Sequence, residues 1–178
     1  MLEKASFCAA ALLVAAAAFA IIDPRFTPVH LVNQSETIRV GTVSGTPKAD
    51  EWKLTVTQAL KGESARECVL ATGSAKKEEV EDIRKVLAQN SAAPAIFFSA
   101  EEDGKKKGYL SLGGMWLEAS SSDGVRWNMR GLAPKLSATW AGGTDMLISL
   151  CRYIVTDPRR RSPLLGRPVL DGRRRRSR

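Results

Sequence analysis

Residues 37–43 read TIRVGTV, and their alternation of apolar and polar side chains breaks at one glycine. Ile38 and Val40 face one side of the predicted strand, and Arg39 faces the other. Gly41 then shifts the following apolar side chain to the opposite parity. A glycine that changes the parity of a strand is typical of a bulge or of the sharp bend in a small barrel. The stretch therefore predicts a strongly bent first strand.

The rest of the chain supplies further strands and two amphipathic helices, separated by turn residues. Gly113-Gly114 is interpreted as a second bulge, inside the fifth strand. Strands are expected at 37–43, 52–60, 65–72, 93–100, 109–119 and 125–130, and helices at 74–90 and 143–156.

The order of these elements predicts the fold class. Three strands, a helix and two strands follow one another as in a small Greek-key barrel of the OB type. An extra strand and a C-terminal helix come after them. We therefore expect a mainly β protein with helices (α+β), built as an OB-like barrel. The competing interpretation is a plain antiparallel α+β sheet with helices on one face.

The first 20 residues have the pattern of a secretory signal peptide. Lys4 gives a positive start, an alanine-rich apolar run follows, and Ala18 and Ala20 stand where a signal peptidase reads small residues. Cleavage after Ala20 predicts export to the periplasm or the extracellular space. The alternative is an uncleaved membrane anchor, because the apolar run continues through Ile22. Residues 21–156 suit a single domain.

Most of the net charge lies at the C-terminal end. The chain has 27 Lys and Arg against 19 Asp and Glu, and its net charge is +8. Nine of the arginines and two aspartates lie in 157–178, so the domain itself is nearly neutral. This distribution does not favour a basic nucleic-acid-binding domain, and the tail is predicted to be disordered. The candidate contacts with a polyanion are Arg126, Arg130, Arg159, Arg160, Arg161, Arg173, Arg174, Arg175 and Arg176.

Two cysteines, Cys68 and Cys151, remain after cleavage of the signal segment. In an oxidising compartment they are a candidate disulfide, which would stabilise the domain by restricting the unfolded chain. The alternative is a pair of buried thiols that pack as small apolar groups. The sequence leaves both interpretations open.

The sequence offers few residues from which a catalytic or metal site can be built. His30 is the one histidine, so a single imidazole is available as a general base. The chain has no Gly-x-Ser-x-Gly elbow, no Cys-x-x-Cys pair and no phosphate-binding glycine motif. We therefore expect no catalytic residue, no metal and no cofactor.

Four stretches of the sequence are similar to those of known proteins: VHLVNQSETIRVGTVSG, DEWKLTVTQALKG, GGMWLEA and ATWAGGTDMLISLCRYIVTDP. They resemble the N-terminal module of large exported bacterial proteins, found in planctomycete-like bacteria, that continue into FG-GAP/VCBS-type propeller repeats. The first two are also similar to netrin-like and tissue-inhibitor OB domains. The resemblance covers residues 28–157 and implies an extracytoplasmic, non-enzymatic module. Metalloprotease inhibition is not carried over, because that family has a cysteine at its mature N-terminus, where this chain has Ile21.

These features predict an exported, non-catalytic binding or accessory module whose partner is another protein or an extracytoplasmic polyanion. The first alternative is a binder of nucleic acid or another polyanion, which would use the barrel surface and the arginine-rich tail. The second is a secreted hydrolase of unrecognised type. The tail has two interpretations: a genuine extension, or the product of a frame change that truncates a larger repeat protein.

Overall fold

The computed structural model describes residues 27–46, 50–63, 65–73 and 75–157, which form seven strands and four helices. The strands are β1 (Thr37–Ser44), β2 (Glu51–Lys61), β3 (Glu67–Ala71), β4 (Pro94–Glu102), β5 (Lys105–Leu112), β6 (Met115–Ser121) and β7 (Arg126–Leu132). The helices are α2 (Pro28–Gln34), α3 (Lys77–Gln89), α4 (Pro134–Thr139) and α5 (Thr144–Thr156). Within these ranges, every helix is too short or too polar to cross a bilayer. The predicted signal segment and the tail from residue 158 onward lie outside the described residues.

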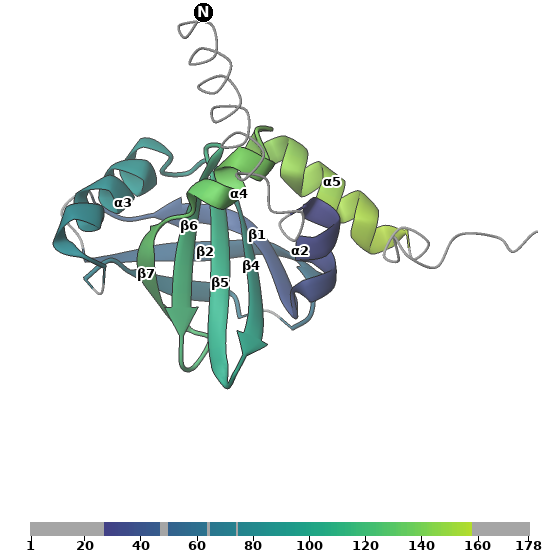
Figure 1. The fold of residues 1–178 in the computed structure, drawn as a ribbon, viewed down its shortest axis with the longest axis horizontal. Helices are drawn as coiled ribbons and strands as arrows, with labels where there is room; N and C mark the ends of the chain where they lie inside the picture. The colour runs from purple at the N-terminus through teal and green to yellow at the C-terminus, as the bar shows by residue number, and fades with distance from the viewer. Residues whose placement is uncertain (1–26, 47–49, 64, 74, 158–178) are drawn as a thin grey trace, which may run out of the picture.

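The strands close into one barrel in the order β1-β2-β3-β7-β6-β5-β4 (Figure 1). Neighbouring strands are antiparallel except β3 and β7, which are parallel. Strand β1 pairs with both β2 and β4, and α3 connects β3 to β4. This arrangement confirms the predicted mainly β, OB-like barrel. The open sheet with helices on one face is excluded, because the ring of strands is closed.

One predicted strand is in fact two. Residues 109–119 contain parts of β5 and β6, which pair with each other on either side of Gly113 and Gly114. Both glycines have positive φ, 57° and 78°, as a two-residue type I′ hairpin turn requires. The bulge expected at these glycines is therefore wrong: they form a tight turn, which adds a strand to the barrel.

The bulge expected in β1 is present. The register between β1 and β2 shifts at Val40 and Gly41. A Cβ on Gly41 would lie 2.1 Å from the carbonyl oxygen of Thr55 on β2. The missing side chain therefore lets the two backbones approach closely where the strand bends.

The interior of the barrel is an apolar cluster that α3 closes at one end. Helix α3 adds its buried residues Ile83, Val86 and Leu87 to the cluster inside the ring of strands. The backbone N–H of Ala92, just after this helix, donates to the carbonyl of Val43 near the end of β1 (2.9 Å). The opposite end of the barrel is the one where β1 begins and where the β4–β5 and β6–β7 turns lie (Figure 1).

Helices α2, α4 and α5 pack on the outside of the barrel, away from α3 (Figure 1). The second apolar cluster joins these helices to the outer faces of β1, β4 and β6. Ile38 and Val40 of β1 belong to this outer cluster, whereas Val43 belongs to the interior one. Strand β1 is therefore buried on both faces, so a polar side chain on it does not automatically reach water.

Candidate functional site

Arg39 is a buried arginine that points into the barrel. It lies on β1 opposite Phe97 of β4, which belongs to the interior cluster, and only 7% of its surface is exposed. Its Nη1 donates to the Sγ of Cys68 at 3.2 Å. Its Nε has no hydrogen-bond partner among the described residues. A buried guanidinium in this state is unfavourable unless an anion completes its surroundings.

No carboxylate pairs with Arg39 within the part of the chain that the structure describes. Arg84 gives a useful contrast: its Nε is also unpartnered, but its guanidinium pairs with Asp50 and Glu81. Burial raises the pKa of the Cys68 thiol, and the nearby guanidinium opposes that shift only in part. The thiol is therefore neutral at neutral pH, and the charge of Arg39 remains uncompensated.

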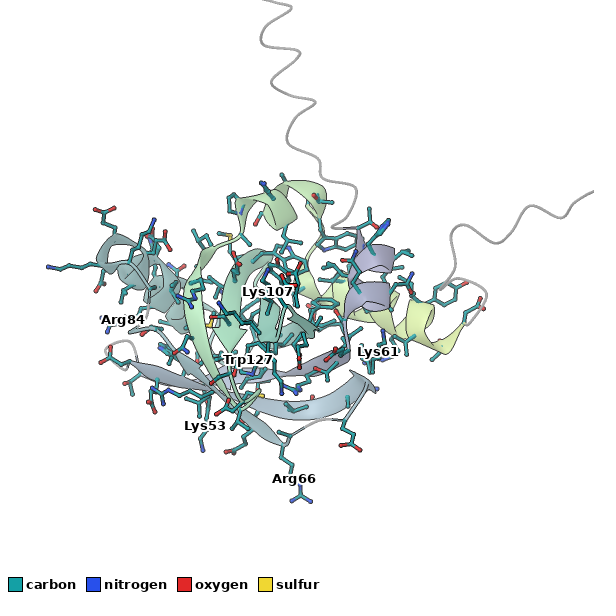
Figure 2. The ribbon with its side chains drawn as sticks, turned by 60° about the horizontal axis from the view of Figure 1, so that its bottom comes forward. Lys53, Lys61, Arg66, Arg84, Lys107 and Trp127 are labelled. Carbon is teal, nitrogen blue, oxygen red and sulfur yellow. The ribbon has the colours of Figure 1, made fainter. Side chains whose placement is uncertain are left out.

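Arg39 lines a hollow of about 220 Å³ at the end of the barrel opposite α3. We call this hollow the barrel mouth; its walls come from the start of β1, the end of β4, the start of β5 and the β6–β7 turn. Trp127 contributes a fully buried ring, which meets Phe97 edge to face with centroids 4.7 Å apart. Figure 2 shows Trp127 within the ring of strands, while Arg66 projects away from the body. The mouth thus combines a buried cation with an aromatic wall.

The rim of the barrel mouth carries both signs of charge. Glu36, Lys106 and Asp123 are among its lining residues. The backbone N–H groups of Val125 and Arg126 donate to Asp123 Oδ1 at 2.8 and 2.9 Å. These bonds lower the pKa of Asp123 to about 2, so this carboxylate is ionised at neutral pH. The Lys106 ammonium donates to the backbone carbonyl of Asp123 (3.3 Å), which leaves its charge available.

A larger hollow of about 420 Å³ lies between α2, β4 and β5, and several of its polar groups are bonded within the protein. Lys107 pairs with Glu102. The buried Ser35 hydroxyl donates to the Leu31 carbonyl at 2.6 Å, and the hydroxyl of Ser99 bonds to that of Thr37 at 2.6 Å. Because this hollow has no unpartnered buried charge among its described lining residues, the smaller barrel mouth is the better candidate site.

The disulfide between Cys68 and Cys151 is not formed. Both cysteines of the described ranges are free and buried. Cys68 lies in the interior cluster, and Cys151, on α5, lies in the outer cluster. The two side chains belong to different cores, and no pair within the described residues is at disulfide distance. The interpretation as buried thiols therefore describes both residues correctly.

Of the arginines predicted to meet a polyanion, the two that the structure describes, Arg126 and Arg130, do not line the barrel mouth. Arg126 and Arg130 are exposed on the outer face of β7. Arg126 pairs with Glu51, and the Nε of Arg130 donates to the Ser120 hydroxyl at 2.8 Å. The other predicted contacts, Arg159, Arg160, Arg161, Arg173, Arg174, Arg175 and Arg176, lie outside the described residues, as do Ala18 and Ala20.

The histidine considered as a general base is on α2, away from the barrel mouth. The Nδ1 of His30 lies 2.8 Å from the hydroxyl of Thr27, the residue that precedes the helix. The described residues contain no group of three or more His, Cys, Asp or Glu side chains that could hold a metal ion.

Arg39 was not among the site residues predicted from the sequence. The alternation of β1 correctly predicts that Arg39 lies on the face opposite Ile38 and Val40. An alternating pattern does not, however, distinguish a face in contact with water from the inside of a barrel. The only available signal was the bend at Gly41, which indicates a closed barrel and hence an interior face.

The fold and the site together define a closed Greek-key barrel with a buried cation at its mouth that pairs with no carboxylate of the described residues. Comparison with protein-family models, with curated proteins and with solved structures finds no match for this chain. The resemblance to N-terminal modules of FG-GAP/VCBS-type proteins stays a prediction.

Proposed function

We propose that this protein is an exported, non-catalytic binding module that holds a small anion in the barrel mouth. The observation that carries the proposal is the state of Arg39, which is buried, lines a hollow and pairs with no carboxylate in the described ranges. Because Arg39 is buried before any ligand binds, the desolvation of its guanidinium is part of the free energy of folding and does not reduce the free energy of binding. The site is preorganised in this sense.

The guanidinium group suits this role. Its donors lie in one plane and can make two parallel hydrogen bonds to an anion that presents two oxygens. The donor set is only partly used, since Nη1 bonds to a thiol, a weak acceptor, and Nε bonds to no described residue. An anion that bonds to Arg39 would satisfy these donors and compensate the charge.

The accessory role and the extracytoplasmic location rest on the sequence: the signal-peptide pattern of residues 1–20 and the resemblance to exported modules. The barrel mouth gives this role a ligand-binding chemistry. The anion could be a free small molecule or the end group of a larger partner, because both present the same charge to Arg39.

The experiment is anion binding measured by thermal unfolding and by calorimetry, with chloride at equal ionic strength as reference. The wild type is expected to gain stability with acetate or phosphate beyond the chloride effect. Arg39→Gln should lose this response. Arg130→Gln is the matched control, because it removes the same charge from an exposed site on β7, and it should respond as the wild type does.

A second readout needs no variant. In the wild type, the Nε–H resonance of Arg39 should shift on titration with the anion, since that donor is unpartnered in the described structure. An anion response that survives Arg39→Gln, together with an unmoved Arg39 resonance, would sink the proposal.

A further inference from the structure

The barrel mouth also has features that narrow the class of its ligand. We infer that it takes a small monocarboxylic acid with an apolar tail, which enters carboxylate first. The inference rests on the proposed function, because it assumes that Arg39 meets the anion.

The charges around the mouth favour a single negative charge. Arg39 and Lys106, which are positive, and Glu36 and Asp123, which are negative, line the hollow, so its lining is balanced in charge. Of these four residues only Arg39 is buried. The Asp123 carboxylate keeps its charge because backbone N–H groups stabilise the ionised form. One added negative charge compensates the buried guanidinium. The second charge of a phosphate or sulfate dianion would meet no second buried cation among the described residues that line this hollow of about 220 Å³.

The apolar residues that line the mouth favour a ligand with a carbon chain attached to its carboxylate. Ala65, Ala100, Val125 and Trp127 line the hollow together with the charged residues. Val125 is 51% exposed, which places an apolar side chain at the rim. A ligand whose carboxylate reaches Arg39 would lay its tail along these side chains and bury apolar surface there.

The size of the mouth limits that tail. Pockets for drug-sized ligands occupy roughly 300–1,000 Å³, and the mouth, at about 220 Å³, is smaller. The mouth therefore suits a short carboxylic acid. It also suits the carboxylate end of a longer molecule whose remainder extends into solvent past Val125.

The test is a calorimetric titration of the wild-type protein with formate, acetate, propionate and butyrate, and with inorganic phosphate and sulfate. All titrations are made at neutral pH and constant ionic strength. We expect the carboxylates to bind more tightly than both dianions. Affinity should rise from formate to butyrate by up to about fourfold for each methylene that becomes buried. In Val125→Ser, whose backbone contacts to Asp123 and Val69 can remain, the step from formate to butyrate should shrink.

The outcomes separate this inference from the proposed function. One outcome is that Arg39→Gln abolishes binding while the wild type binds phosphate as tightly as butyrate. In that case the inferred monocarboxylate ligand is wrong, and the proposal of an anion site at Arg39 is retained. Affinity that is independent of chain length in the wild type would also overturn the ligand class. If Arg39→Gln leaves the binding of every anion unchanged, both proposals fall.

Discussion

The Arg39 guanidinium donates to the Cys68 thiol at 3.2 Å inside the barrel. The thiol is a weak, neutral acceptor, because burial raises its pKa. The contact therefore fixes the position of the guanidinium without compensating its charge. The described part of the barrel interior therefore contains a cation that its thiol neighbour positions but does not neutralise.

We expect Arg39 to lower the free energy of unfolding of the ligand-free protein. Replacing it by methionine keeps much of the side-chain volume and removes the unsatisfied charge, so Arg39→Met should raise the free energy of unfolding by about 1–3 kcal/mol. Urea denaturation in a buffer whose only anion is chloride measures this difference. A variant that is less stable than the wild type would mean that Arg39 has a structural partner and is not held for a ligand.

Asp123 should make the β6–β7 turn sensitive to acid. Its pKa is about 2 in the folded protein against an ordinary value of 3.8, so the folded state binds the proton more weakly than the unfolded state. The stabilisation is therefore complete above about pH 4 and is lost as the pH falls from about 4 to about 2. Melting temperatures of the wild type and Asp123→Asn should differ at neutral pH and converge over that interval. A difference that stays constant down to the lowest pH would contradict the assignment.

Cys151 should make the free energy of unfolding decrease as the pH rises through the alkaline range. Burial raises the pKa of its thiol to about 12 from an ordinary value of 9.0, so the unfolded state loses this proton first. The contribution of the thiol to stability is complete below about pH 9 and falls as the pH rises toward 12. Wild-type protein should therefore lose more stability than Cys151→Ala between those values, as urea denaturation at several pH values can show. Equal slopes for the two proteins would show that the thiol ionises in the folded state.

Gly41 should tolerate no side chain. In Gly41→Ala the new Cβ would collide with the carbonyl oxygen of Thr55, a backbone atom that cannot move alone, and the free energy of unfolding should fall by about 1–3 kcal/mol or more. Gly73→Ala is the matched control, because a Cβ there meets no atom within 4 Å. Similar stability of the two variants would show that β1 and β2 can separate at the bend.

The sequence predicted most of the barrel because its strands and helices carry local signals. Strand β2 alternates Trp52 and Leu54 with exposed residues, and α3 buries Ile83, Val86 and Leu87 along one helical face. Gly113 and Gly114 were misinterpreted because two glycines within an apolar run suit both a bulge and a turn. Only the pairing of β5 with β6 distinguishes these possibilities.

The site was not predictable in the same way. The neighbours of Arg39 at the mouth come from segments far apart in the chain: Cys68 on β3, Lys106 on β5 and Trp127 on β7. No spacing in the sequence connects them. The separation of Cys68 from Cys151 has the same origin, because the assignment of each residue to the interior or the outer cluster depends on barrel closure.

The most direct test of the central claim is a crystal structure of the wild-type protein grown with butyrate. We predict that the carboxylate lies in the barrel mouth, within hydrogen-bond distance of the Nε of Arg39, with its carbon tail toward Val125. An Arg39 side chain that is paired with a carboxylate of the protein, with no butyrate in the mouth, would contradict the account.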